Sequence, residues 1–310
     1  MTEVSRVAAI DCGTNSIRLL VADAVDGGLR EVDRRMVIVR LGQGVDATGV
    51  FAPEALERTF AACSEYASLI KSYGVERVRF VATSAARDVA NRDEFFAGVH
   101  ARLGVEPDII AGSEEAALSF AGATGGLADV PGPYLVADIG GGSTELVLGD
   151  ADGVIQAESL DMGSVRMTER HVRSDPASPD EVAGMTRDID ALLDATVVPL
   201  AKTRSLVGVA GTVTTVAAVA LDLPEYDRDR VHHARISAAQ LVETTSWLLS
   251  STRLERASRA AIHPGRVDVI GAGALILARL HARLHGCLAV DELLVSEHDI
   301  LDGTALSLLE

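Results

Sequence analysis

Two short glycine-rich segments carry the residue types that hold a phosphate group, and they occur at matching positions 127 residues apart. The first is DCGTNS at residues 11–16, and the second is DIGGGS at residues 138–143. Glycine lets backbone N–H groups approach an anion closely, and a Ser or Thr hydroxyl adds a donor. The Asp that precedes each turn can hold a cation against the phosphate. One such turn is also typical of an ordinary hairpin, but the matched pair predicts two phosphate loops.

Other segments place hydroxyls, carboxylates or arginines at the ends of predicted elements. Residues 113–115 (SEE) put two carboxylates in the first turn of a helix, where the helix dipole alone also favours them. Arg87 follows a predicted strand. Its planar guanidinium can donate two hydrogen bonds to phosphate oxygens, but a solvent-exposed arginine in a loop is equally consistent with the sequence. Gly211 and Thr212 open a helix after an apolar strand, which makes a further candidate anion site or a plain turn. Arg166 and Arg266 follow glycine-containing turns, and each of these turns is likewise either a candidate anion site or an ordinary turn.

The elements that must position these residues form two sets. Apolar runs at residues 7–11, 17–23 and 29–40 predict three antiparallel strands, and helices then alternate with strands to about residue 124. Glycines and prolines at residues 125–133 predict a domain boundary, giving domains 1–127 and 128–310. The second half repeats the opening hairpin, and residues 222–234 are expected to be a polar loop. The last helix belongs to the second domain or packs back on the first.

The composition limits the partners. The 310 residues are 48% hydrophobic and have a formal charge of −17, which disfavours general binding to nucleic acid or anionic membranes. Three widely separated cysteines, Cys12, Cys63 and Cys287, indicate reduced thiols in a cytoplasmic protein. Only one short apolar run precedes the first Asp of the N-terminal strand, so no signal peptide is expected. The sequence has no P-loop, no dinucleotide-binding GxGxxG in a Rossmann setting and no GxSxG elbow.

Six segments taken together resemble the exopolyphosphatase/guanosine pentaphosphate phosphohydrolase family. They are AIDCGTNSIRLLVAD, ATSAARD, IAGSEEA, VADIGGGSTELVLG, GSVRMTE and GVAGTVTT. The resemblance implies an α/β fold of two duplicated ribonuclease H-like domains of the actin, hexokinase and Hsp70 superfamily, with a cleft between them. It also implies a short, two-domain, actinobacterial-type member that acts as a homodimer. Many members have Arg-Glu-Gly near the C-terminus where this chain has Leu301-Asp302-Gly303, a departure that bears on processive action and not on the chemistry.

The resemblance also implies roles for individual residues. Glu115, the second Glu of SEEA, is expected to deprotonate the attacking water. Asp138 and Glu145 are expected to bind metal, Mg²⁺ or Mn²⁺, and the matching position of the first loop adds Asp11. The expected phosphate-binding residues are Gly13, Thr14, Asn15, Ser16, Arg87, Gly140, Gly141, Gly142, Ser143, Thr144, Gly211, Thr212, Arg166 and Arg266.

The expected reaction is hydrolysis of the terminal phosphoanhydride bond of inorganic polyphosphate, which releases orthophosphate. The same chemistry on guanosine pentaphosphate is the first alternative, because both substrates present the same terminal bond. A kinase of the same superfamily and a non-catalytic regulator that binds polyphosphate or alarmone are the others. The carboxylates at positions 115, 138 and 145 favour an enzyme.

Overall fold

The computed structural model of the chain describes residues 5–25, 28–87, 89–125, 127, 130–288 and 290–309, with the backbone alone for residues 286–288. The chain divides into two compact units. Unit 1 comprises Met1–Gly122 and Ile300–Glu310, and unit 2 comprises Ala123–Asp299. The division falls inside helix α5 (Gly112–Thr124), a few residues before the predicted boundary, and residue 128 itself lies outside the described residues.

The described part of unit 1 contains a five-stranded sheet in the order β3-β2-β1-β4-β5. Its strands are β1 (Arg6–Cys12), β2 (Ser16–Val25), β3 (Gly28–Ile38), β4 (Arg77–Ala82) and β5 (Asp108–Ile109). The first three are antiparallel neighbours, while β4 and β5 run parallel to β1. The predicted turn between β2 and β3 includes residues 26 and 27, which lie outside the described residues.

Unit 2 repeats this order and adds one strand. Its described sheet reads β10-β11-β9-β6-β7-β8, with β6 (Tyr134–Ile139), β7 (Thr144–Asp150), β8 (Gly153–Leu160), β9 (Ser205–Val209), β10 (Arg235–Ser237) and β11 (Glu292–Val295). The register repeats as well, because Asp11 faces Arg18 across β1 and β2 as Asp138 faces Glu145 across β6 and β7. Even the register shift recurs, between Val21 and Ala22 in β2 and between Leu148 and Gly149 in β7. The predicted duplicated ribonuclease H-like fold class is therefore confirmed.

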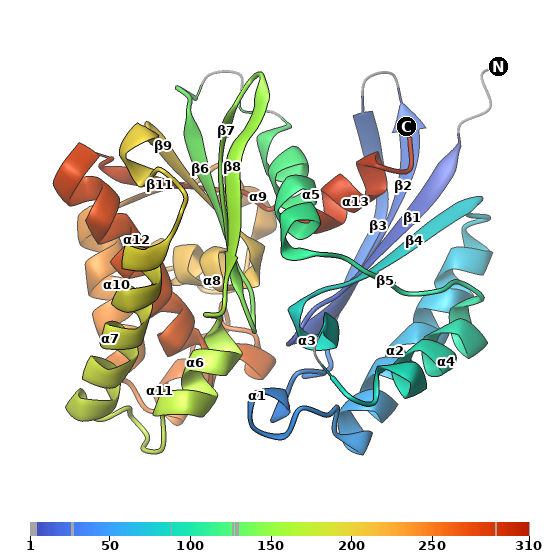
Figure 1. The fold of residues 1–310 in the computed structure, drawn as a ribbon, viewed down its shortest axis with the longest axis horizontal. Helices are drawn as coiled ribbons and strands as arrows, with labels where there is room; N and C mark the ends of the chain where they lie inside the picture. The colour runs from blue at the N-terminus through green and yellow to red at the C-terminus, as the bar shows by residue number, and fades with distance from the viewer. Residues whose placement is uncertain are drawn as a thin grey trace. The chain divides into compact units, whose positions relative to one another are not determined.

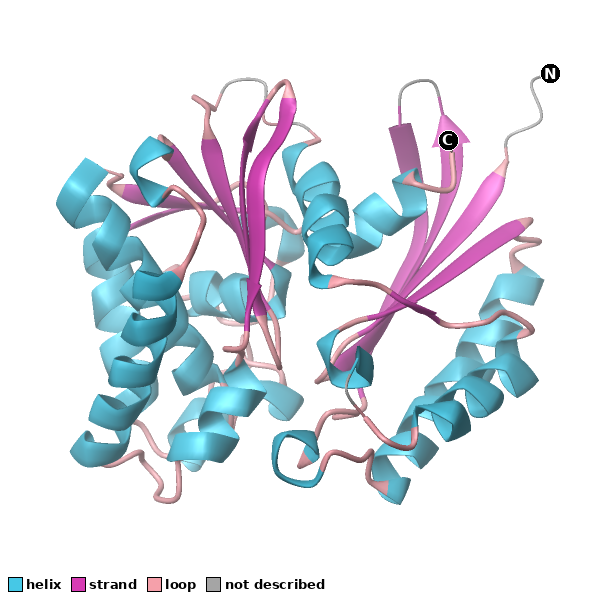
Figure 2. Ribbon diagram, viewed as in Figure 1, coloured by secondary structure: helices cyan, strands magenta, loops and turns pink. Residues whose placement is uncertain are grey.

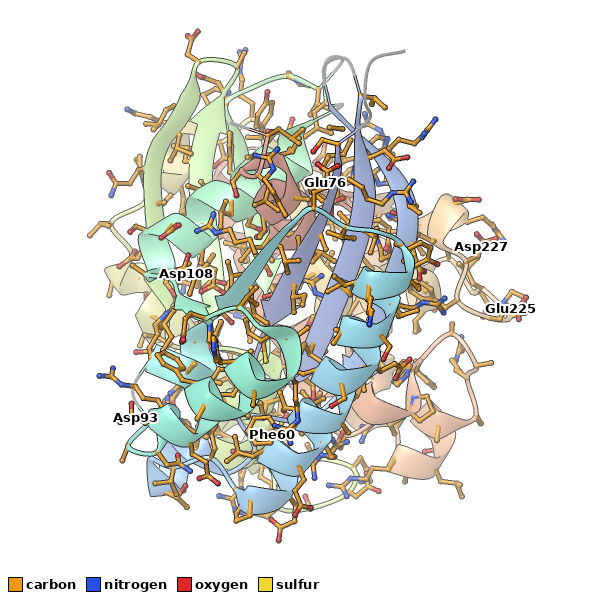
Figure 3. The ribbon with its side chains drawn as sticks, turned by 90° about the vertical axis from the view of Figure 1, so that its right-hand side faces the viewer. Phe60, Glu76, Asp93, Asp108, Glu225 and Asp227 are labelled. Atoms are coloured by element: carbon orange, nitrogen blue, oxygen red, sulfur yellow. The ribbon has the colours of Figure 1, made fainter. Side chains whose placement is uncertain are left out.

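Helices cover both faces of the unit 1 sheet. On one face, α2 (Pro53–Ser72) and α4 (Arg92–Leu103) lie side by side, as Figure 1 and Figure 2 show, over a core that includes Ile10, Leu19 and Phe80. The two helices approach closely because Gly98 leaves room for the ring of Phe60 (Figure 3), where an added Cβ would lie 2.1 Å from the ring. On the other face, α13 (Ile300–Leu306) buries Leu301 and Ala305 against β1 and β2.

Residues 300–310 therefore group with the N-terminal strands, not with the rest of the sequence-predicted second domain. Two further segments differ from expectation. The predicted polar loop at residues 222–234 contains a short helix, α9 (Arg228–Val231), whose Asp227 side chain caps the backbone N–H groups of Asp229 and Arg230. The segment after β4, for which the sequence predicts no helix, forms the helical turn α3 (Ser84–Arg87).

Unit 2 has the larger core, in which α12 (Ile270–Leu288) and α8 (Ala210–Ala220) contribute more buried residues than any other element. The described segments also include the short helices and turns α1 (Val45–Thr48), η1 (Leu200–Lys202), α11 (Arg253–Ala257) and η2 (Pro264–Arg266), and the helices α6 (Ser164–His171), α7 (Pro179–Ala195) and α10 (Ala238–Ser250). Reciprocal Ser–Glu and Ser–Gln capping boxes begin α7 and α10. Among the described residues, no helix combines the length and apolarity needed to cross a bilayer.

Candidate active site

The first phosphate loop connects β1 to β2. Its turn is closed by the Gly13 N–H, which donates to the Ser16 carbonyl at 3.0 Å. The Thr14 carbonyl accepts from Gly42, and the Asn15 carbonyl accepts from two successive N–H groups of residues 39 and 40. Because the carbonyl and the N–H of a trans peptide point in opposite directions, the N–H groups that follow these carbonyls face away from residues 39–42. They are therefore directed to the side where an anion can bind.

Polar side chains of this loop are buried and converge with the start of α3. The hydroxyls of Thr14 and Ser84 share a hydrogen bond of 3.1 Å. The Asn15 side chain is buried, and its Nδ2 has no hydrogen-bond partner within the described part of the chain. A buried amide donor without a partner is uncommon and is available to an incoming acceptor. The predicted phosphate-binding residues of unit 1 thus form one local set.

Cys12, at the end of β1, is not available as a nucleophile. Burial raises the pKa of its thiol well above the usual range, and Cys63 and Asp11 raise it further. Burial also raises the pKa of Cys63 to about 12. Both are free buried thiols, as predicted, while the side chain of Cys287 lies outside the description. Since the reactive form of cysteine is the thiolate, chemistry at this loop must use other groups.

The two carboxylates of the SEE segment have different surroundings. The Glu114 side chain is 47% exposed and accepts a hydrogen bond from Arg79, which also donates to Asp108. The Glu115 side chain is 8% exposed and accepts a hydrogen bond from Arg87. Arg87 also donates through Nε to the Ile110 carbonyl at 3.2 Å. The structure therefore brings together the predicted base and the predicted phosphate-binding arginine, and it gives Glu114 a structural ion pair.

Asp11 is paired with a residue that the sequence reasoning missed. Both Nε and Nη2 of Arg18 donate to Asp11 Oδ2, at 2.9 and 2.7 Å. Asp11 is 5% exposed, and the two residues stand directly opposite each other in the antiparallel pair. The sequence contained a signal for this pair. Under the offset of 127 residues, Asp11 corresponds to Asp138 and Arg18 corresponds to Glu145, so a pairing in one repeat implies the same pairing in the other.

The second phosphate loop connects β6 to β7 with the same closing bond, from the Gly140 N–H to the Ser143 carbonyl at 3.0 Å. Its carbonyls face the start of α6: Gly140 and Gly141 accept backbone N–H groups from residues 164–166, and Gly142 accepts from Arg166 Nε at 2.6 Å. The N–H groups of residues 141–143 consequently point away from α6. Three successive amides oriented in this way form a concave anion site.

Close packing of α6 on this loop requires glycine. A Cβ added to Gly163 would lie 2.3 Å from the Gly141 carbonyl oxygen. Thr144, expected to bind phosphate through its position in the loop, donates its hydroxyl to the Met162 carbonyl at 2.6 Å and holds the segment that leads into α6. Its side chain is fully buried.

Arg266 and the start of α8 lie at the same end of unit 2. A Cβ at Gly211 would lie 1.9 Å from Arg266 Nη2, so the guanidinium lies against the glycine backbone. A Cβ at Gly273 of α12 would lie 2.4 Å from Thr212 and 3.2 Å from Ser164, which places α8 beside α6. Ala210, which precedes Gly211, has φ of 67°, a costly conformation for a residue with a side chain. The structure therefore gathers the predicted phosphate-binding residues of unit 2 into one region.

Asp138 and Glu145 form an acidic pair in this region. They are 6% and 1% exposed and lie opposite each other on the same face of β6 and β7. The Ser159 hydroxyl, also missed from the sequence, donates to Glu145 Oε1 at 2.7 Å and orients the carboxylate. Within the described residues, no three His, Cys, Asp or Glu side chains form a complete metal cage. Two adjacent carboxylates nevertheless fit Mg²⁺, which takes one or two protein carboxylates together with phosphate oxygens and water.

Comparisons of the sequence and of the structure with known proteins give the same family of phosphatases. The sequence profile of the Ppx/GppA phosphatase family matches residues 20–308. The chain is 50% identical over 316 residues to Exopolyphosphatase 2 of Mycobacterium tuberculosis, covering 98% of this chain and 99% of the relative. It is 37% identical to a guanosine-5'-triphosphate,3'-diphosphate pyrophosphatase of Vibrio cholerae over 169 residues, 54% of this chain and 33% of that protein. A solved exopolyphosphatase-like protein matches with a TM-score of 0.95 and 44% identity, covering 99% of this chain and 98% of that one.

Proposed function

Because the chain belongs to the Ppx/GppA phosphatase family, we propose that it is an exopolyphosphatase that hydrolyses the terminal phosphoanhydride bond of inorganic polyphosphate and releases orthophosphate. The observation that carries this proposal is the buried carboxylate of Glu115, which lies in the first turn of α5 and accepts a hydrogen bond from Arg87. The Mycobacterium tuberculosis relative is named an exopolyphosphatase, and its 50% identity extends over almost the whole length of both chains.

Glu115 acts as the general base. Arg87 binds Oε2, which leaves Oε1 to accept a proton from water as that water attacks the terminal phosphorus. Each glycine loop offers its backbone N–H groups to phosphoryl oxygens, and in unit 1 the Asn15 amide adds a further donor. Arg166 and Arg266 neutralise further phosphates of the chain. Within each unit, backbone hydrogen bonds hold the loop in its conformation, so little reorganisation of each loop is needed during the reaction.

Asp138 and Glu145 would hold Mg²⁺ or Mn²⁺, and Ser159 keeps the Glu145 carboxylate in position. When bound, the cation would supply positive charge next to the phosphoryl oxygens. The N–H groups of residues 141–143 lie in the turn, and Asp138 and Glu145 lie on the two strands that the turn joins, so one phosphate can meet both sets.

The test is orthophosphate release in the presence of Mg²⁺ from short polyphosphate, long polyphosphate and guanosine pentaphosphate. Glu115→Gln should lower kcat at least about 100-fold with KM changed little, since a general base contributes to the transition state. Glu114→Gln is the matched control, because it removes the neighbouring exposed carboxylate, and its kcat should stay within about twofold. Equal activity of the two variants would exclude Glu115 as the base.

Guanosine pentaphosphate hydrolysis is the alternative that a specific observation favours, namely the similarity of half the chain to the Vibrio cholerae pyrophosphatase. The same assay separates the two, since the preferred substrate is the one with the higher kcat/KM. If the wild-type protein binds these polyanions tightly but releases no phosphate from any of them, the regulator alternative replaces the enzyme.

We further propose that the protein is cytoplasmic and works as a homodimer, without nucleic-acid or membrane partners. The family resemblance supports the dimer, and the formal charge of −17 disfavours polyanionic surfaces. Light scattering coupled to size-exclusion chromatography gives the mass directly. A mass of about 32.5 kDa at micromolar concentration would contradict the dimer.

A further inference from the structure

Three histidines that the proposed reaction does not use lie together in unit 2. His232 and His233 follow α9, and His298 follows β11. The ring centroids of His232 and His233 are 3.8 Å apart in a stacked arrangement, and those of His232 and His298 are 4.7 Å apart. Because histidine is the side chain that ordinarily titrates closest to neutral pH, the charge of this cluster depends on pH.

One hydrogen bond fixes the protonation state of His232. The backbone N–H of Glu297 donates to His232 Nδ1 at 3.1 Å. A backbone amide nitrogen only donates, so Nδ1 must be the unprotonated ring nitrogen, and the neutral ring carries its proton on Nε2. A protonated His232 would present an N–H group to the N–H group of Glu297, and the bond would be lost.

The loop that carries His232 is held by bonds that do not titrate. The His233 N–H donates to the Val295 carbonyl at 2.7 Å, and the Val295 N–H donates to the Ala234 carbonyl at 2.9 Å. His233 has φ of 61°, a costly conformation for a residue with a side chain. Protonation of His232 would therefore remove a contact to residues 296–299, which lead from β11 into α13, while the loop stays attached to β11.

The surroundings oppose positive charge on the stacked rings. Burial lowers the pKa of His233, and His298 lowers it further. The Glu297 carboxylate already accepts from the Tyr226 hydroxyl and lies 3.5 Å from Arg228 Nε. The neutral cluster is therefore most stable above the ordinary histidine pKa of about 6.5, and it loses stability as the pH falls below this value.

The elements packed around the cluster bring few other charges. Strand β9 and helix α8, which both contact β11, have no ionisable side chain. The other ionisable side chains on α9 and its cap, on β10, on β11 and on residues 296–299 are Asp227, Asp229, Arg230, Arg235, Glu292 and Asp299.

We propose that His232 is a pH-sensitive switch, which holds residues 296–299 while it is neutral and releases them when it is protonated. The released segment leads directly into α13, whose Gly303 lies against the backbone of Leu118 in the helix that carries Glu115. Acidification therefore loosens the segment next to a helix that supports the candidate base. This inference goes beyond the proposed function and does not depend on it.

The first measurement is hydrogen exchange of residues 296–299 in the full chain at pH 7.5 and at pH 5.5, which is still above the isoelectric point of about 4.8. After correction for the intrinsic effect of pH on exchange, wild-type protection should fall at least about threefold at pH 5.5. His232→Asn should stay protected at both pH values, because the Oδ1 atom of asparagine accepts in place of Nδ1 and does not titrate. His232→Ala should be poorly protected at both.

His100→Asn is the matched control, because it makes the same change at a histidine of α4 whose side chain is 56% exposed. It should show the pH dependence of the wild type. Wild-type protection that does not change with pH overturns the inference. Full protection in His232→Ala, or a loss in His232→Asn as large as that in the wild type, overturns it as well.

The second measurement follows the ring of His232 itself by nitrogen-15 NMR of histidine-labelled protein. Its resonances are identified by their absence from His232→Asn. At pH 7.5 the proton should be on Nε2, and Nδ1 should gain a proton over the pH range in which residues 296–299 lose protection. A proton on Nδ1 at pH 7.5 contradicts the switch. Neither measurement uses a substrate, so a protein without phosphatase activity would count against the proposed function and not against this inference.

Discussion

At the scale of single residues, two neighbouring carboxylates in the first turn of α5 have different surroundings. Glu114 and Glu115 are about 100° apart around the helix, because an α-helix has 3.6 residues per turn. Glu114 faces solvent and Arg79, and Glu115 is buried beside Arg87. A buried carboxylate with one fixed partner has few orientations available, which suits a base that must meet a water molecule at a defined position.

The fork of Arg87 is predicted to matter more than its charge. Arg87→Lys keeps the positive charge but cannot donate both to the Ile110 carbonyl and to Glu115 in one fixed geometry. We expect kcat to fall about 10- to 100-fold in steady-state phosphate release, with a smaller change in KM. An Arg79→Lys variant, which alters the ion pair of Glu114, is the control and should retain kcat. Wild-type kcat in Arg87→Lys would show that charge alone is sufficient.

Asp23 links three strands of unit 1 by its charge. Arg6 on β1 and Arg30 on β3 face Asp23 in register, and Arg6 Nε donates to it at 2.7 Å. The hydrogen bond from Arg6, followed by that from Arg30, lowers the pKa of the Asp23 carboxyl below its ordinary value. Asp23 is 2% exposed, whereas the Arg30 side chain is 66% exposed and is screened by solvent.

A lowered pKa in the folded state means that ionised Asp23 stabilises the fold. Its contribution is complete above the unfolded-state pKa of about 3.9 and disappears as the pH falls through the lower folded-state value. Asp23→Asn should therefore lower the free energy of unfolding by about 1–2 kcal/mol at pH 7. The difference from wild type should shrink at pH 3.5. Urea unfolding at the two pH values measures it, and a difference that grows on acidification would contradict this account.

At the scale of elements, the helix that carries Glu115 is positioned by the C-terminal helix. Gly303 of α13 lies against the backbone of Leu118, and an added Cβ would be 1.9 Å from the Leu118 carbonyl oxygen. Leu118 follows Glu115 by one helical turn, so a displacement of this contact moves the carboxylate as well. An ion pair between Arg34 Nη2 and Asp302, at 2.5 Å, fastens α13 to β3. The Leu301-Asp302-Gly303 segment thus has a packing role within unit 1.

Gly303→Ala is expected to lower stability by about 1–3 kcal/mol, the usual cost of overpacking a tight contact. It should also lower kcat more than KM, because α5 must shift to admit the methyl group. Thermal unfolding and phosphate release report the two effects on the same samples.

Gly28→Ala is the matched control in the same unit, because an added Cβ there meets no atom of the described residues within 4 Å. It should change stability by less than about 0.5 kcal/mol and leave kcat unaltered. If Gly303→Ala behaves like this control, α13 does not position the helix of Glu115.

At the scale of the whole molecule, the chain closes unit 1 with its last residues. Leu301 and Ala305 are fully buried against Val7, Ala9 and Leu20. The core on this face of the first strands is therefore complete only when α13 packs on it. Unit 2 has its own extensive core, which contains no residue of the C-terminal helix. The stability of unit 1 therefore depends on a contact between the two ends of the sequence.

Deletion of residues 300–310 should expose the apolar face of β1 and β2 and unfold unit 1 selectively. Hydrogen exchange followed by mass spectrometry should show lost protection in residues 6–25 and retained protection in residues 134–150. Full protection of residues 6–25 in the truncated chain would show that unit 1 folds without its C-terminal helix.

Features encoded by local sequence were predictable. The glycine turns, the Asp at each strand end and the alternation of apolar residues are set by neighbouring residues, so the duplicated loops and the fold class could be read without coordinates. The short helices α3 and α9 could not, because four residues give too weak a periodic signal. Pairings such as Asp11 with Arg18 depend on the register of the two strands. Comparison of the two repeats implied this register, whereas each motif taken alone did not.

The sequence by itself determined that this protein has two equivalent glycine-rich loops, an α/β duplicated fold and the residue types of a phosphoanhydride hydrolase. Only the tertiary structure decided which of two adjacent glutamates is buried, which aspartate is already paired with an arginine, and which unit the last residues complete. The reason is physical. Turn formation depends on a few adjacent dihedral angles, whereas burial and ion pairing depend on contacts between residues as far apart as Arg34 and Asp302.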